Sequence, residues 1–139
     1  MRHILSALFA SVLPALACAG DLTVRIEHIR NDHGSILAAL YDSEASFMQQ
    51  PSARAKFKVK AAAGTVEYVF HDLPAGKYAL SAFHDENDNG KLDKNFVGYP
   101  REGYGFSNGA RASGGPPGVS QAAFVFDGTT QSIRVTLQY

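Results

Sequence analysis

The stretch TVEYVFHDLPAGKYALSAF, residues 65–83, contains the clearest indication of the fold. Large apolar residues at positions 66, 68 and 70 alternate with residues 65, 67 and 69, and a period of two is typical of a half-buried strand. Leu73-Pro74-Ala75-Gly76 then predicts a turn, because proline presets φ and glycine supplies a positive φ. Tyr78–Phe83 follows as a second strand, so the stretch predicts two consecutive strands joined by a tight turn.

The same period extends to both ends of the chain. Residues 22–27 and 133–139 alternate, with His28 at the inward phase of the first strand's end, and residues 57–59 alternate with lysines. Residues 35–41 are apolar on both phases, which favours a central strand, and residues 122–126 make a further short one. Residues 44–54 break the pattern and predict a long loop with one helical turn.

About seven strands with frequent turn signals predict an all-β fold, a seven-stranded antiparallel sandwich of the immunoglobulin type. A closed barrel is the alternative. The 139 residues are enough for one domain, which we place at residues 20–139. The 13 basic and 13 acidic residues balance, so the charge excludes a general attraction to nucleic acid.

The first nineteen residues have the features of a signal peptide. Arg2 and His3 precede an apolar run, and Ala17-Cys18-Ala19 supplies the small residues of a cleavage site. We therefore predict a signal peptide at residues 1–19 and export to the periplasm or the cell exterior. The alternatives are a membrane anchor, for which the run is short, and a lipoprotein acylated at Cys18. Cleavage after Ala19 would leave a mature chain with neither a thiol nor a membrane span.

A long insertion, residues 84–118, follows the 78–83 strand and is rich in Gly, Asn, Pro and aromatic residues. It starts with HDENDNGKLD, residues 84–93. Counted from its first aspartate, this stretch matches a calcium loop of the EF-hand type, in which short oxygen-bearing side chains at alternate positions surround one ion and a glycine makes the bend. The predicted calcium ligands are Asp85, Asn87, Asn89, the carbonyl of Lys91, and Asp93.

The match to a calcium loop is incomplete, because position twelve is Phe96 rather than a glutamate. Glu102, Asp42 or a backbone carbonyl could supply the missing oxygen. Glu86 and Asp88 fall between the ligand positions and are expected to face solvent. The alternative interpretation is a plain polar loop, since Asp, Asn and Gly are common in turns.

The histidines do not form a recognisable transition-metal motif. His84 has no second histidine at zinc-like spacing, so we expect an orienting or core role for it. His28, His33 and His71 are scattered along the chain.

Two features could indicate an enzyme. Gly105-Phe106-Ser107-Asn108-Gly109 matches the GxSxG pattern, but no apolar helix and no histidine follow it, so we do not assign Ser107 as a nucleophile. The acids of the 84–93 loop also permit a two-carboxylate glycosidase, a weak alternative because one flexible loop rarely gives two carboxyls different environments.

The rest of the insertion could form a binding surface. Aromatic rings next to hydrogen-bonding groups suit a glycan or a peptide, although the same rings could instead pack over the sandwich. The candidate surface residues are Tyr99, Glu102, Tyr104, Phe106, Ser107 and Asn108.

The stretch FHDLPAGKYALSAFHDENDNGKLDKNFVGYPREGYGFSNGA, residues 70–110, resembles a family of secreted bacterial proteins known as domain of unknown function 2141. The similarity extends from Gly20 to Tyr139. That family resembles in turn the transthyretin-like or carboxypeptidase-regulatory type of immunoglobulin-like sandwich. The resemblance supports the predicted fold and implies no activity, and therefore no catalytic residues.

Together these observations predict an exported, non-enzymatic binding or accessory domain with a structural calcium ion and an unidentified envelope partner. An envelope hydrolase acting on glycan or peptide, and a purely structural domain without metal, are the alternatives.

Overall fold

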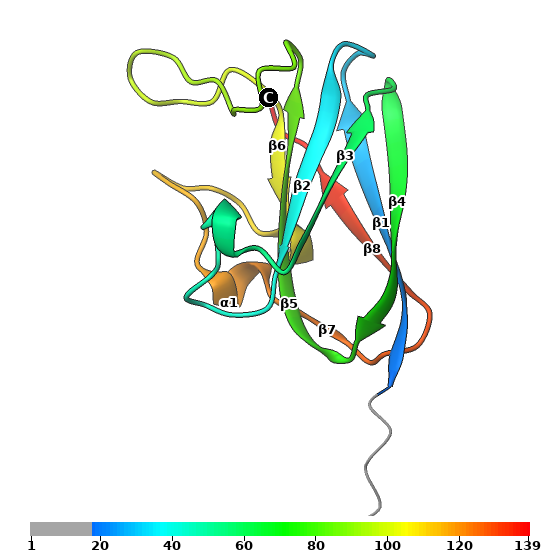
Figure 1. The fold of residues 1–139 in the computed structure, drawn as a ribbon. Coiled ribbons are helices and arrows are strands. Elements are labelled where there is room, and N and C mark those ends of the chain that lie inside the picture. The colour runs from blue at the N-terminus through cyan, green and yellow to red at the C-terminus, as the bar shows by residue number, and fades with distance from the viewer. Residues whose placement is uncertain (1–17) are drawn as a thin grey trace, which may run out of the picture.

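The computed structural model describes residues 18–139, and most of the predicted signal peptide lies outside these residues. Two β-sheets pack face to face, as Figure 1 shows, which confirms the all-β sandwich. One sheet has the strand order β4-β1-β8, and the other has the order β3-β2-β5-β6, with β7 paired to β5. The strands are β1 Ala19–Ile29, β2 Ser35–Tyr41, β3 Ala55–Lys60, β4 Gly64–Pro74, β5 Gly76–Asp85, β6 Tyr104–Phe106, β7 Phe124–Phe126 and β8 Gln131–Thr136.

The strand count and one pairing differ from the prediction. The described residues form eight strands, because β6 lies inside the insertion that showed no periodicity. All pairings between these strands are antiparallel except that of β1 with β8. The turn before β8 lies beside the start of β1, where the Cys18 thiol donates to the Gly128 carbonyl at 3.3 Å. Since both strands start at the same end of the sandwich, they run parallel.

The helical content is small. A 3₁₀ turn, Gln50–Ser52, confirms the helical turn predicted in the 44–54 loop. A second 3₁₀ turn covers Ser107–Gly109, and helix α1, Val119–Ala122, occupies the start of what we predicted as a strand. None of the helices within residues 18–139 has the length and apolar character needed to cross a bilayer.

The main core lies between the two sheets. It includes residues from β1, β2 and β5 that are almost fully buried, such as Val24, Leu40 and Leu80. At the end of β1 a β-bulge interrupts the pairing, and His28 takes a positive φ of 63°. The prediction that His28 points inward is therefore wrong: its side chain is exposed, and Ile29 takes the buried position.

The larger sheet is covered on its outer face as well. A second cluster, which includes Ala79, Phe106 and Ala122, packs there together with Phe47 from the 44–54 loop. Burial on both faces explains why β2 is apolar on both phases and confirms it as a central strand. The end of β5 that carries the insertion is therefore held by a well-packed sheet.

Candidate functional site

The acidic loop, residues 85–93, begins at a buried carboxylate. Asp85 is the last residue of β5 and is 0% exposed. Its Oδ1 accepts the Asn89 N–H at 3.1 Å, and its Oδ2 accepts the Gly90 N–H at 2.7 Å. Gly90 has a positive φ of 77°, which favours glycine. The chain therefore folds back over Asp85, and this carboxylate shapes the turn.

Two amides and one carboxylate meet on the exposed side of this turn. Asn87 and Asn89 donate their amide N–H groups to the Asp93 carboxylate, at 2.6 Å from Asn87 and at 2.9 and 3.0 Å from Asn89. The amide oxygens accept backbone N–H groups, from Asn89 at 3.2 Å and from Lys91 at 2.9 Å. These hydrogen bonds, first from Asn89 and then from Asn87, lower the pKa of Asp93. The predicted ligands thus come together in one short loop.

Glu102 joins the two ends of the acidic loop. Its side chain is buried, and its two oxygens accept the N–H groups of Glu86 and Asp93, each at 3.0 Å. Of the residues considered for position twelve, Glu102 is the one that reaches the loop. Phe96 is fully exposed, and Asp42 follows the far end of β2, where its partner is Arg54 at 3.9 Å.

The expectation that Glu86 and Asp88 face solvent holds for Asp88, which is exposed, but Glu86 is half-buried, and both carboxylates make ion pairs. The Arg30 guanidinium donates to both Glu86 oxygens, at 2.5 and 2.8 Å, and these hydrogen bonds lower the pKa of Glu86. Asp88 accepts the Ser35 hydroxyl at 2.6 Å and lies 3.3 Å from the Lys58 ammonium. Both contacts lower the pKa of Asp88, that with Ser35 the most. Protein cations therefore compensate two of the four acids in the loop.

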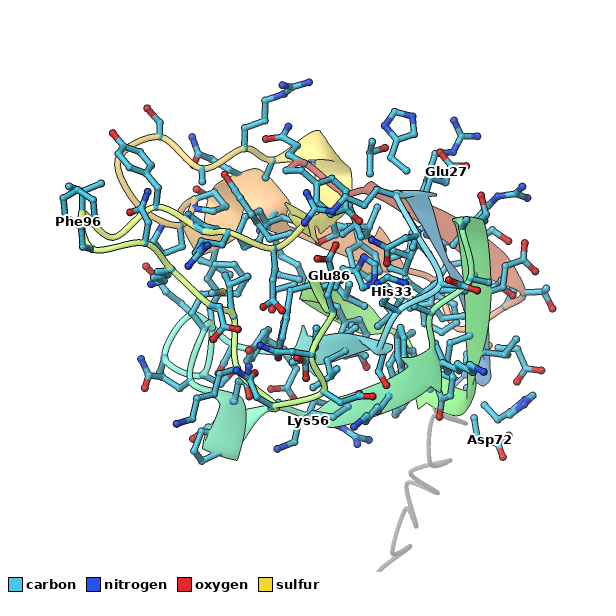
Figure 2. The ribbon with its side chains drawn as sticks, turned by 90° about the horizontal axis from the view of Figure 1, so that it is seen from above. Glu27, His33, Lys56, Asp72, Glu86 and Phe96 are labelled. Carbon is cyan, nitrogen blue, oxygen red and sulfur yellow. The ribbon has the colours of Figure 1, made fainter. Side chains whose placement is uncertain are left out.

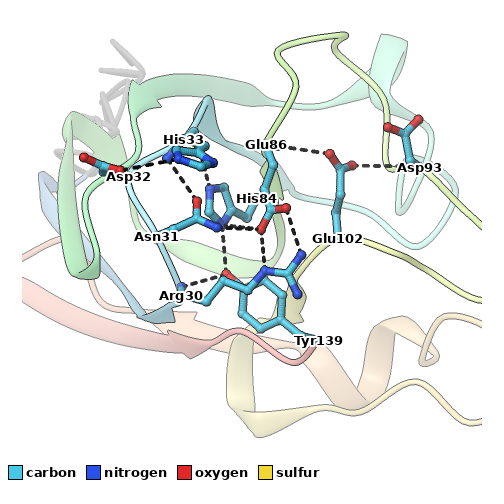
Figure 3. A network of polar contacts seen from close by, with 9 residues as sticks. All are labelled: Arg30, Asn31, Asp32, His33, His84, Glu86, Asp93, Glu102 and Tyr139. Atoms are coloured by element: carbon cyan, nitrogen blue, oxygen red, sulfur yellow. Dashed lines mark hydrogen bonds and ion pairs between the residues drawn. The ribbon is translucent and has the colours of Figure 1, made fainter.

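A buried histidine connects the loop to the body of the sandwich (Figure 3). His84 is fully buried, and its Nε2 lies 2.7 Å from the His33 carbonyl, which can only accept. The proton of a neutral His84 is therefore assigned to Nε2, and Nδ1 accepts the Tyr139 hydroxyl at 2.8 Å. Burial raises the pKa of Tyr139, so its hydroxyl keeps the proton that it donates. His84 thus has the structural position expected of a core residue.

Sequence reasoning missed Arg30, Asn31 and Tyr139 in this network. Arg30 lies against the Tyr139 ring, with its guanidinium carbon 4.4 Å from the ring centroid, and Asn31 donates to Glu86 at 3.3 Å. Arg30 is 56 residues from Glu86, and Tyr139 is 55 residues from His84. No local spacing links residues this far apart, so only the packing of strand ends brings them together.

The six candidate surface residues divide into two groups. Tyr99 and Asn108 are exposed and Tyr104 is half-buried, whereas Glu102, Phe106 and Ser107 are buried and cannot contribute to an open surface. The Ser107 hydroxyl accepts the Leu80 N–H at 2.8 Å and donates to the Ala122 carbonyl at 2.5 Å. Ser107 thus holds the insertion against β5, a structural reason for this residue in the GxSxG pattern.

The strongest exposed apolar feature is a turn directly after the acidic loop. Phe96, Val97 and Tyr99 are 100%, 59% and 68% exposed. Lys94 and Pro100 form a bridge below them, and we call residues 94–101 the apolar tip. Figure 2 shows Phe96 at the end of this projection, away from the sheets.

The metal-binding potential of the loop depends on its amides. Nowhere in residues 18–139 do three or more His, Cys, Asp or Glu side chains group closely enough to hold a metal ion. The predicted calcium set has two carboxylates, two amides and one carbonyl. Oxygen donors of this kind suit a hard cation such as calcium rather than zinc.

Comparison with known proteins identifies the family. Residues 24–134 match the model of the family described as an uncharacterised protein conserved in bacteria (DUF2141). The match covers most of the chain, so the protein belongs to this family, and the predicted resemblance is confirmed. No curated protein matches the chain, and no solved structure matches it. The immunoglobulin-like resemblance and the predicted export stay predictions.

Proposed function

We propose that this protein is an exported, non-enzymatic accessory domain in which calcium stabilises the acidic loop and so holds the apolar tip in place for an envelope partner. The proposal is supported above all by the convergence of Asn87 and Asn89 on the Asp93 carboxylate. Asp85 and the carbonyl of Lys91 belong to the same turn.

The donors fit calcium in number and type. A carboxylate has about four lone-pair positions, so Asp85 keeps acceptor capacity besides its two backbone hydrogen bonds. Half a turn of each amide group would direct Oδ1 of Asn87 and of Asn89 towards Asp93 in place of the N–H groups, and the terminal torsion of asparagine permits this. The half turn would break the hydrogen bonds that these oxygens accept from the N–H groups of Asn89 and Lys91, so binding of the ion has to offset that loss. Asp93 would then supply the charge, and its hydrogen-bond partners in this loop are neutral amides.

The role of the ion would be structural. An ion that binds only the folded loop stabilises the protein by about 2.7 kcal/mol when its concentration is a hundred times Kd. The apolar tip follows Asp93 directly, and the Arg101 N–H donates to the Asp93 carbonyl at 2.8 Å. An ion held by Asp93 would therefore restrict both ends of the tip.

A structural domain without metal is the second candidate. It is supported by the contacts of Glu86 with Arg30 and of Asp88 with Lys58, which reduce the repulsion between the acids without an ion. The two candidates differ in one measurable property, the effect of calcium on stability.

The deciding experiment is a calcium titration of the purified, chelator-treated protein by calorimetry, with magnesium as a control, together with thermal melting. We expect saturable calcium binding and a calcium-dependent rise in Tm. Asp93→Asn should lose most of this rise because it removes one of the two carboxylate charges of the predicted ligand set. Asp127→Asn is the matched control: Asp127 is exposed, and its pKa is lowered by the Thr129 hydroxyl at a distant turn. Identical melting curves with and without calcium would rule out the proposal.

The hydrolase alternative would instead show turnover of a glycan or peptide that Asp93→Asn abolishes without changing Tm.

A further inference from the structure

The apolar tip gathers three large apolar side chains on one turn, and exposed apolar groups that lie together can mark an interaction site, whereas single ones are ordinary. Elsewhere in the described chain, the exposed large apolar residues Met48, Val125 and Tyr139 lie on separate segments. In the tip, Phe96 and Val97 are adjacent, and Tyr99 is two residues further on. The side chains therefore reach solvent as a group.

The backbone of the tip is well organised. Asn95 Oδ1 accepts the N–H groups of Val97 and Tyr99, both at 3.0 Å. The Asn95 N–H donates to the Tyr99 carbonyl at 2.8 Å, and Gly98 donates back to the Asn95 carbonyl at 3.0 Å. Gly98 has a positive φ of 91°, which favours glycine. A preformed turn loses little conformational entropy when its side chains become buried in a partner.

Cations surround the apolar side chains. Lys94 and Arg101 lie on either side of the tip, Lys91 precedes it, and all three are exposed. Within residues 18–139 none of the three lies within 4.0 Å of a carboxylate oxygen, although Arg101 and Lys91 help to lower the pKa of Asp93. The nearby acids Glu86 and Asp88 are compensated by Arg30 and Lys58. The tip therefore presents positive charge next to its apolar group.

The shape favours one class of partner. The tip projects from the sandwich with Phe96 at its end, as Figure 2 shows, so its shape suits insertion into a partner better than enclosure of a small ligand. A bilayer surface accepts projecting Phe, Val and Tyr side chains without a matching pocket, and Lys and Arg then remain at the headgroups. We propose that the apolar tip inserts Phe96, Val97 and Tyr99 into the surface of a membrane that contains anionic lipids. This inference rests on the proposed function only for the part that calcium plays in ordering the tip.

The test uses tryptophan as a reporter, since the chain contains none. Phe96→Trp should show a blue shift of its emission when vesicles of phosphatidylcholine and phosphatidylglycerol are added, and a smaller one with phosphatidylcholine alone. Val125→Trp places the same reporter on β7 at an exposed apolar position and should show no shift. An unchanged emission of Phe96→Trp would overturn the inference.

Sedimentation with the same vesicles then measures the contribution of each group. Phe96→Ser should weaken binding about tenfold, the loss expected for one apolar side chain, while Val125→Ser should bind like the wild type. Lys94→Gln together with Arg101→Gln should weaken binding to the anionic vesicles, and added salt should do the same. Equal sedimentation of the wild type and Phe96→Ser would contradict the inference.

The two proposals can fail separately. A calcium-dependent rise in Tm without vesicle binding would remove the membrane inference and leave the proposed function. Vesicle binding with no effect of calcium on Tm would remove the proposed function and leave the membrane inference. A third result is that the wild type binds no vesicles but binds a soluble envelope glycan or peptide, and that Phe96→Ser loses this binding. That result would assign the tip to the soluble partner and overturn the membrane inference.

Discussion

The two halves of the 84–118 insertion place phenylalanine side chains in opposite environments. Phe96, in the first half, is fully exposed, whereas Phe106, ten residues later, is 7% exposed. Both halves contain Gly, Asn, aromatic residues and an Arg. The comparison teaches that composition identifies this region as an insertion but does not decide which part of it joins the core.

Residues 102–107 of the second half are largely buried because a strand fits beside β5. In β6, Tyr104 pairs with Phe83 and Phe106 pairs with Ser81. Glycine permits a close approach of β6 to the end of β8: a Cβ on Gly105 would lie 2.6 Å from the Thr136 carbonyl oxygen. The first half instead satisfies its backbone N–H groups through side chains such as Asn95, Asp85 and, from the second half, Glu102. It therefore needs no neighbouring strand.

The largest expected effect is a difference in stability between variants of the two phenylalanines. Phe106→Ala should destabilise the protein by about 3–5 kcal/mol, because it leaves a cavity in the cluster that covers the outer sheet face. Phe96→Ala should change stability by less than about 0.5 kcal/mol, because its side chain makes no buried contact. Urea unfolding of both variants is the measurement. Similar losses in the two variants would contradict the division of the insertion.

A smaller difference in stability is expected between variants of the two aspartates that begin and end the acidic loop. Asp85→Ala should cost on the order of 2–3 kcal/mol even in chelator, because the N–H groups of Asn89 and Gly90 lose their buried acceptor. Asp93→Asn, at the exposed end, should matter mainly when calcium is present. Urea unfolding in chelator is the measurement, and wild-type stability of Asp85→Ala there would show that the carboxylate does not shape the turn.

The smallest effect concerns acid stability. Arg30 lowers the pKa of Glu86 below its ordinary value of 4.5, so this ion pair contributes its full stability above that pH and loses it as the pH falls through the lowered value. Both side chains are partly exposed, which limits the contribution to about 1 kcal/mol. Glu86→Gln should therefore lose less stability than the wild type between about pH 6 and pH 3. Equal losses, measured by urea midpoints, would show that the pair adds nothing.

The strands were largely predictable because alternation is a local property of the chain. Val66, Tyr68 and Phe70 face the interior side of β4, and the both-phase apolar pattern of residues 35–41 correctly indicated a central strand. The three residues of β6 are too few to show a period. The parallel pairing of β1 with β8 depends on which ends of two distant strands meet, and no segment of sequence records that by itself.

The acidic loop was likewise predictable only in its local contacts. The spacing of Asp85, Asn87, Asn89 and Asp93 was enough to predict that they share one turn, because the hydrogen bonds among these four residues span only 2 to 6 residues. The partners that compensate the charge are distant in the sequence: Arg30, which binds Glu86, directly follows β1, and Lys58, which binds Asp88, lies in β3. Their contacts exist only once the sheets have packed.

The sequence by itself therefore determined the β-sandwich class, the position of the insertion and the oxygen-rich turn at its start. Only the tertiary structure decided that Phe106, Ser107 and Glu102 are buried, that Phe96 is exposed, and that His84 is held by Tyr139. The physical reason is the range of the interactions. Periodicity and turn chemistry act between near neighbours in the chain, whereas burial and charge compensation depend on which strand ends lie side by side in space.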